Sequence, residues 1–176
     1  SCGSTAVVVS AHQSIGCGAI ALFGTEEQKQ YWLPRVSQDT LSAFCLSEPN
    51  VGCDAAGQET RCEVSEDGEY YILNGEKKWA TSAAFAGMFT VMCKQMVTDP
   101  KSGKTKELVT ALICTPDMDG IKITSVAENA RLSSAVAVRG EAWRLQVKSG
   151  SNPTDRGCLP AKQARVWRHH VWRHPS

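Results

Sequence analysis

Two short stretches hold the residues best suited to chemistry. AFCLSEPNVGCDAA, residues 43–56, begins as an apolar strand and breaks into a polar loop, and WATS, residues 79–82, follows about one hairpin later. Gly52 would let the loop backbone approach a ligand closely, and the face of Trp79 could pack against a planar ring. Three hydroxyls could add hydrogen bonds: Ser47, Thr81 and Ser82. This set suits a large polar aromatic cofactor, although turns, a core tryptophan and capping hydroxyls would leave the same pattern.

The elements that precede these stretches are predicted to be helical. Apolar residues recur at helical spacing from Ala6 to Phe23, and Gly24 suits a C-terminal cap. Thr25-Glu26-Glu27-Gln28 fits a capping box, in which Thr25 and Gln28 satisfy free amides at a helix start. We expect this second helix to run to about Trp32 and to stop before Pro34.

From Leu41 onward the apolar residues alternate as in strands. The strongest short turn signal is Asn74-Gly75. Two predicted strands, Thr60 to Val64 and Tyr70 to Leu73, are expected to form a hairpin, and Phe89 to Met96 and Leu108 to Thr115 form another pair. Ile121 to Val126 is a last short strand. The fold class is therefore α+β: a helical N-terminal segment followed by a small antiparallel β-sheet or barrel domain, with an irregular C-terminal tail.

Length and composition are those of an ordinary globular chain. The 176 residues, 42% apolar and 21% charged, suffice for one domain with a core. No secretory signal is visible, and we expect no transmembrane segment because no apolar run approaches the length of a bilayer span. The eight cysteines contain no C-x-x-C pair, so free thiols in a reducing compartment are expected, with no metal site.

The charge is distributed unevenly along the chain. Residues 1–130 hold ten basic and sixteen acidic residues, a net charge of −6, whereas residues 131–176 hold nine and two, a net charge of +7. The basic end has neither helical nor strand periodicity and is predicted to be a poorly ordered tail, of the kind that a shifted reading frame or a retained intron produces. Alternatively it could contact nucleic acid or anionic membrane. Three histidines could bind a metal: His169, His170 and His174.

Five segments in order resemble the acyl-CoA dehydrogenase family, particularly its very-long-chain subgroup. They are SAHQSIG, FGTEEQKQYWLP, AFCLSEPNVGCDAA, YYILNGEKKWATS and FTVMCKQMVTDPKSGKTKELVTALI. The resemblance implies that residues 1–40 are the end of a helical N-terminal domain and that residues 41–130 are the flavin-facing middle β-domain. Residues 131–176 would be an atypical tail.

The resemblance also implies a flavoprotein oxidoreductase of mitochondrial fatty acid β-oxidation. Such enzymes use FAD to oxidise fatty acyl-CoA across the Cα–Cβ bond and pass electrons to an electron-transferring flavoprotein. Full-length relatives form homo-oligomers, whose interface is mostly absent from this sequence. No nucleic acid partner is implied.

The family's cofactor site can be carried over residue by residue. Phe44, Cys45, Leu46 and Ser47 fall on the strand at the flavin's pyrimidine edge, and Trp79, Ala80 and Thr81 fall on the stretch along the ring. Gly52 and Cys53 fall on the loop beside the FAD pyrophosphate, where Cys53 would also meet the acyl-CoA. The family usually has Thr at position 47 and Ser at position 53.

The family's catalytic glutamate lies in a C-terminal helical domain that this sequence lacks, so no catalytic residue is assigned. Glu128 and Glu141 are carboxylates outside any matching motif. We therefore expect a fragment or truncated isoform of an FAD-dependent acyl-CoA dehydrogenase that is inactive alone. A non-catalytic binding or assembly module is the alternative, and an interaction protein acting through its basic tail is a third hypothesis.

Overall fold

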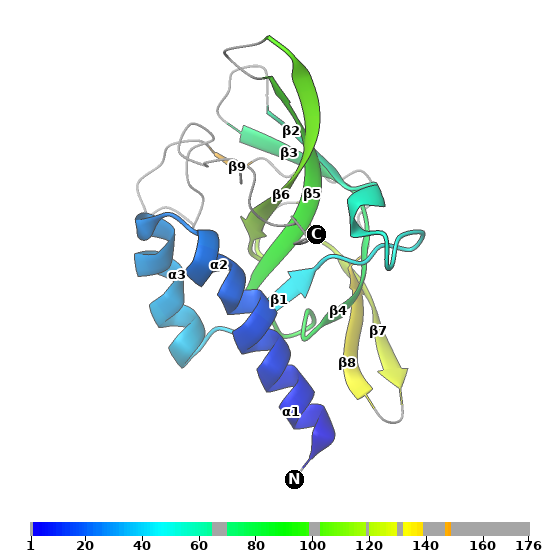
Figure 1. Ribbon diagram of the computed structural model, residues 1–176. Helices are drawn as coiled ribbons and strands as arrows, with labels where there is room; N and C mark the ends of the chain where they lie inside the picture. Colours follow the sequence, from blue (N-terminus) through cyan, green and yellow to red (C-terminus); the bar gives the residue numbers. More distant parts are fainter. Residues whose placement is uncertain are drawn as a thin grey trace, which may run out of the picture.

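A helical segment leads into two β-sheets (Figure 1). The computed structural model describes most of the chain. The described residues are 2–64, 70–98, 103–118, 120–129, 132–138 and 147–148. Within them the chain has the α+β class that the sequence predicts.

The first helical rod is continuous from Gly3 to Phe23. It consists of α1 (Gly3–Ser10), a π-helical stretch η1 (Ala11–Cys17) and α2 (Gly18–Phe23). The rod ends where the Gly24 amide donates to the Ile20 carbonyl at 2.8 Å. The π-helical stretch widens the middle of the rod, and its buried residue Gly16 lies against Ser42 of strand β1.

By length and composition alone, this rod would suffice to cross a bilayer. It has 21 residues and a mean hydropathy of 1.6, and only 11% of its most apolar window is buried. The expectation that no apolar stretch is long enough for a span therefore does not hold on those two criteria. Core helices of soluble proteins and signal sequences near an N-terminus meet the same criteria.

The second helix confirms one sequence prediction and corrects another. In α3 (Glu26–Gln38) the Gln28 amide donates to the Thr25 hydroxyl and the Gln28 side chain accepts from the Thr25 amide, so the predicted capping box is present. The helix does not stop before Pro34, which lies inside it. Burial of Trp32 and Val36 on one face stabilises the helix on both sides of the proline. This packing outweighs the single backbone bond that proline cannot make.

The strands form two sheets. Six strands belong to the first sheet: β1 (Ser42–Cys45), β2 (Arg61–Val64), β3 (Tyr70–Asn74), β5 (Met88–Thr98), β6 (Thr105–Cys114) and β9 (Val147–Lys148). Three belong to the second: β4 (Lys77–Thr81), β7 (Ile123–Asn129) and β8 (Leu132–Val138). A short 3-10 turn, η2 (Ala55–Gly57), interrupts the loop after β1.

The first sheet is mixed rather than wholly antiparallel. The predicted hairpin pairs β2–β3 and β5–β6 are antiparallel, but β1 and β2 each run parallel to β5. Alternation in the sequence identifies a strand but not the direction of its neighbour. The parallel pairs join segments more than thirty residues apart, which only the tertiary structure brings together.

Two predictions about the rest of the chain change in detail. The Asn74-Gly75 signal marks a corner and not a hairpin, because β3 and β4 on its two sides belong to different sheets. Part of the predicted irregular tail is β-structure, since LSSAVAV at 132–138 is the strand β8 between β4 and β7. The remainder of that tail, including Glu141 and the three predicted metal-binding histidines, lies outside the described residues apart from β9.

The core has two parts. The larger part lies within the sheets and includes the buried residues Ala43, Cys45, Leu73, Ala80 and Phe89. The smaller joins the helices to β5 through Ile20, Trp32, Val36 and Met88. Seven cysteines are described and all are free thiols, as expected from their spacing; Cys158 lies outside the described residues.

Candidate functional site

The predicted flavin-facing residues come from β1 and β4, which are edge strands of the two sheets. Among the strands that the structure describes, β1 pairs only with β5 and β4 only with β8. The remaining edges of β1 and β4 lie next to each other (Figure 1). One backbone bond joins them, from the Lys78 amide to the Ser47 carbonyl at 2.7 Å. The structure therefore brings together the two stretches that the sequence placed some thirty residues apart.

The β1 stretch alternates between the core and the junction. Phe44, Leu46 and Ser47 are partly exposed, whereas Cys45 is buried. Burial raises the pKa of the Cys45 thiol to about 12, against a smaller opposing effect of the Lys77 charge. Cys45 is thus a neutral core side chain, and only its backbone could contact a cofactor.

The β4 stretch presents Trp79 through a distortion of the strand. The pairing with β8 shifts register between Lys77 and Ala80, and Trp79 in between has a φ of 63°. A left-handed conformation is strained for a bulky side chain. The result is that Ala80 is buried while Trp79 is 52% exposed, with the Lys78 ammonium 4.8 Å from its ring centroid.

Two hydroxyl residues follow the exposed tryptophan. Thr81 is partly exposed at the end of β4. Ser82 has a φ of 67° and is buried, and its hydroxyl finds no partner among the described residues. A buried hydroxyl without a partner is uncommon, so a donor or acceptor outside the described part of the chain would satisfy it.

The loop between β1 and η2 leaves room on its outer side. Gly52 and Cys53 are exposed, and a Cβ atom built on Gly52 would meet no atom within 4 Å. Gly52 does not have a positive φ, so the loop does not need the conformational freedom of glycine at this position. The loop is closed instead by paired backbone bonds between Glu48 and Val51, of 2.9 and 3.3 Å.

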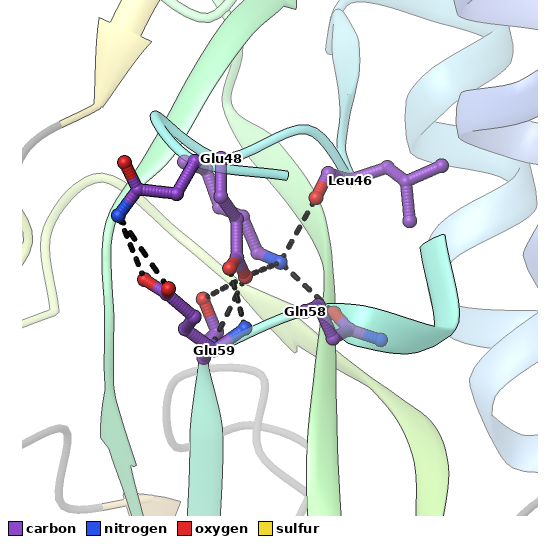
Figure 2. A network of polar contacts seen from close by, with 7 residues as sticks. Leu46, Glu48, Gln58 and Glu59 are labelled. Atoms are coloured by element: carbon purple, nitrogen blue, oxygen red, sulfur yellow. Dashed lines mark hydrogen bonds and ion pairs between the residues drawn. The ribbon is translucent and has the colours of Figure 1, made fainter. Parts of the chain in front are cut away.

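A buried ion pair lies beneath this loop, and sequence reasoning missed it. The Lys77 ammonium donates to the Glu48 carboxylate at 2.6 Å, and the two side chains are 4% and 1% exposed (Figure 2). The Glu48 carboxylate also accepts from the Thr60 amide at 3.0 Å, from the Thr60 hydroxyl at 2.6 Å and from the Glu59 amide at 2.5 Å. Lys77 also donates to the Gln58 side-chain oxygen and the Leu46 carbonyl, both at 3.0 Å.

Opposing effects act on both charges of this pair. Burial by itself would raise the pKa of Glu48, but the hydrogen bonds from Lys77, Thr60 and the Glu59 amide together hold that pKa below its ordinary value. Burial lowers the pKa of Lys77, and the bond and charge of Glu48 only partly oppose that effect. No spacing rule links two residues 29 positions apart, although two consecutive lysines in a strand imply that one of them faces inward.

The geometry can do one thing chemically: offer a partly exposed indole, two strand edges and hydroxyls to a flat polar ligand. Edge strands carry unpaired backbone donors and acceptors, which suit a ligand with alternating donors and acceptors. Trp79 offers the stacking face. The described residues therefore fit the flavin that the sequence predicts. The Glu48 carboxylate beside this junction is already engaged by the buried network.

The sequence matches two neighbouring domains of one family. Residues 43–137 match the acyl-CoA dehydrogenase middle domain and residues 1–40 match the acyl-CoA dehydrogenase N-terminal domain. The chain belongs to the acyl-CoA dehydrogenase family. The N-terminal match accounts for the apolar rod as part of a helical domain.

Curated and solved acyl-CoA dehydrogenases agree with this assignment. The mitochondrial very long-chain specific acyl-CoA dehydrogenase of Macaca fascicularis is 46% identical over 116 residues, which are 65% of this chain and 18% of that protein. The crystal structure of an acyl-CoA dehydrogenase complexed with FAD from Bacillus anthracis superposes with a TM-score of 0.70 at 33% identity, covering 82% of this chain and 24% of that chain.

A further solved structure, described as an electron transferring flavoprotein of Acidaminococcus fermentans, has a TM-score of 0.68 at 29% identity, with 81% of this chain and 37% of that one covered. The chain thus spans about a fifth of the length of the curated mitochondrial relative.

Proposed function

We propose that this chain forms the flavin-facing wall of an FAD-dependent acyl-CoA dehydrogenase acting on fatty acyl-CoA. The observation that carries the proposal is the meeting of the free edges of β1 and β4 beside the exposed ring of Trp79. The FAD-complexed relative from Bacillus anthracis supports the choice of ligand.

Each predicted residue has a role that its position allows. The backbone of Phe44 to Ser47 would bind the polar edge of the flavin, and the Ser47 and Thr81 hydroxyls would orient it. Trp79 would stack on the ring and exclude water from it. Cys45 and Ala80 would contribute their backbone, because their side chains are buried. When bound, FAD accepts the hydride in such dehydrogenations.

Cys53 is expected to weaken the binding of FAD. Its thiol is exposed on the loop predicted to lie beside the pyrophosphate and the acyl-CoA. A thiol is a poor donor, and losing a hydrogen bond to a charged group costs about 1.5 to 3 kcal/mol. Cys53→Ser should therefore lower the Kd for FAD, and an unchanged Kd would contradict this role.

The wall alone is not a complete active site. The resemblance assigns the proton-abstracting carboxylate to a domain outside the matched residues, so the purified 176-residue chain should show no turnover of a long-chain acyl-CoA. Transfer of electrons to an electron-transferring flavoprotein and a mitochondrial location belong to the same proposal. They are supported by the names of the relatives.

The test is the visible absorption spectrum of the purified chain with added FAD. We expect a red-shifted, structured flavin band that is lost in Trp79→Ala. Trp32→Phe is the matched control, because Trp32 lies in the helical core and should leave the band unchanged. A spectrum identical to that of free FAD would contradict the proposal. Detectable turnover of acyl-CoA would contradict the predicted inactivity of the chain.

Exposed apolar residues support a second candidate, a non-catalytic assembly module. Leu22 on α2 is 73% exposed and Phe85, after β4, is 76% exposed. Such surface suits contact with a full-length subunit of the same family. A one-to-one complex with such a subunit in a flavin-free state, lost in Leu22→Ser, would favour this module.

The third hypothesis, an interaction protein acting through its basic tail, concerns residues outside the described part of the chain. It would require binding to nucleic acid or anionic membrane that weakens as the salt concentration rises.

A further inference from the structure

We propose that Lys77 is a positioning residue that holds the flavin-facing end of β1 against β4 by binding the Leu46 carbonyl. The proposal rests on the proposed flavin site and extends it to a residue beneath that site. The Lys77 side chain is buried and is not among the residues predicted to contact the flavin.

All three protons of the Lys77 ammonium have acceptors. They are the Leu46 carbonyl at 3.0 Å, the Glu48 carboxylate at 2.6 Å and the Gln58 side-chain oxygen at 3.0 Å. Lysine has three donors and no acceptor, so the group is saturated. A saturated ammonium has one orientation, and the Leu46 carbonyl is therefore held in one direction.

The next residue of β4, Lys78, also binds a carbonyl after β1, but through its backbone amide. The Lys78 amide donates to the Ser47 carbonyl at 2.7 Å. Two consecutive residues of β4 thus bind two consecutive carbonyls after β1, one through a side chain and one through the backbone. Together they determine the distance and angle between the two edges that would receive the flavin.

The same contact stabilises the strained conformation of Trp79. The register shift lies between Lys77 and Ala80, which are both buried, and Trp79 lies inside the shift with a φ of 63°. A strained residue persists only where its surroundings determine its conformation. Buried anchors on both sides of the shift supply that constraint.

Glu48 has a different task in this network. Its carboxylate binds the Thr60 amide and hydroxyl and the Glu59 amide, which lie at the far end of the loop (Figure 2). Glu48 therefore closes the loop, whereas Lys77 reaches the stretch next to the flavin. In Glu48→Gln the amide oxygen can still accept from Lys77, and the bond to Leu46 can remain.

The experiment compares Lys77→Met with Glu48→Gln, and Lys106→Met, at an exposed lysine of β6, is the control. The first readout is hydrogen exchange at the residue 78 amide, measured relative to the slowest amides of β5. The second is the Kd for FAD, and the third is the urea midpoint of unfolding.

We expect Lys77→Met to raise the exchange rate and the Kd by about tenfold or more, the change expected when a charged donor is lost. Glu48→Gln should lower the urea midpoint yet change the other two readouts by less than about threefold, because it removes no donor to Leu46. Lys106→Met should leave all three near wild type, since its exposed side chain lies away from the junction of β1 and β4.

Equal effects of Lys77→Met and Glu48→Gln on exchange would overturn the proposal, because the ion pair would then act only on stability. If Lys77→Met does not fold, the double variant with Glu48→Gln carries the test, since it leaves no unpaired buried charge. Faster exchange at position 78 is required there too. If the wild type binds no FAD, the proposed function fails, while exchange at position 78 still decides the role of Lys77.

Discussion

The two ends of β1 are held by junctions of opposite chemistry. At its start, Ser42 is bound by neutral groups of the helical rod, centred on His12. After its end, Leu46 and Glu48 are bound by a buried charge, Lys77. The first junction joins the helical segment to the sheet, and the second joins the two sheets to each other.

The neutral junction is satisfied in one tautomer of His12. Its Nε2–H donates to the Val36 carbonyl at 2.9 Å, and its Nδ1 accepts from the Ser42 amide at 3.0 Å. The Ser42 hydroxyl donates to the His12 carbonyl at 3.1 Å. Gly16 lies so close that a Cβ atom there would be 2.9 Å from the Ser42 Cβ. This junction depends on shape and on neutral hydrogen bonds.

The two junctions should differ in how much stability a single substitution removes. Removing one member of a buried ion pair leaves an uncompensated charge, whereas removing a neutral partner leaves an unsatisfied dipole. The ionic junction should therefore be the more sensitive to a single substitution, and the neutral one should depend more on space.

Glu48→Ala should cause the largest loss, because it leaves the Lys77 charge buried and frees the donors of Thr60 and Glu59. The expected decrease in the free energy of unfolding is about 3 to 5 kcal/mol. Urea unfolding of the whole chain measures it. Glu59→Ala is the control, since the Glu59 side chain is exposed and its amide is retained. Similar losses in both variants would contradict the ionic account.

His12→Leu should cost less than Glu48→Ala. It leaves the Ser42 amide and the Val36 carbonyl without their partner, each at a cost of about 1 to 3 kcal/mol before relaxation. The same urea experiment applies. Gln13→Leu is the control on the next, exposed position of the helix. If His12→Leu is as stable as its control, the hydrogen bonds of this junction do not stabilise the packing of the helical rod against β1.

Gly16→Ala tests space at the same junction. The new methyl group would displace Ser42, and overpacking of this kind costs about 1 to 3 kcal/mol. Gly18→Ala is a matched control in the same rod, because its Cβ would meet only the Gln13 carbonyl at 3.8 Å. That change should be neutral or stabilise the helix by about 0.5 to 1 kcal/mol. A lower thermal midpoint for Gly16→Ala, together with an unchanged or higher midpoint for Gly18→Ala, is required.

Lowering the pH should gradually remove the contribution of the Glu48–Lys77 pair to the free energy of unfolding. Near neutral pH this is the smallest of the predicted effects. The folded pKa of Glu48 lies below its ordinary value of 4.5. Its contribution is therefore fully present above about pH 4.5 and is lost as pH falls through the folded value. The difference in stability between wild type and Glu48→Gln should shrink below pH 4.5. A constant difference down to pH 2.5, about two units lower, would show that folding does not lower the pKa of Glu48.

Local rules in the sequence predicted local features well. The capping box at Thr25 and the hairpin pairs β2–β3 and β5–β6 are present as expected. Each depends on residues close together in the chain. The continuation of α3 through Pro34 was not predicted, because it depends on packing of Trp32 and Val36 in the core.

The candidate site divides in the same way. The residues Ser47, Trp79 and Thr81 were found from residue type and a family resemblance, and the structure places their strands side by side. Lys77 was not found, because a lysine in a strand is most often solvated, and the pair Lys77-Lys78 implies only that one of the two faces inward and not which one.

The sequence by itself indicated most of the helices and strands, the family and the residues that could meet a flavin, because these follow from short-range patterns and ordered motifs. Only the tertiary structure decided which strands run parallel, which lysine is buried and why Trp79 faces outward. Those outcomes depend on contacts between residues some thirty positions apart, and their energies are set by the surroundings that folding creates.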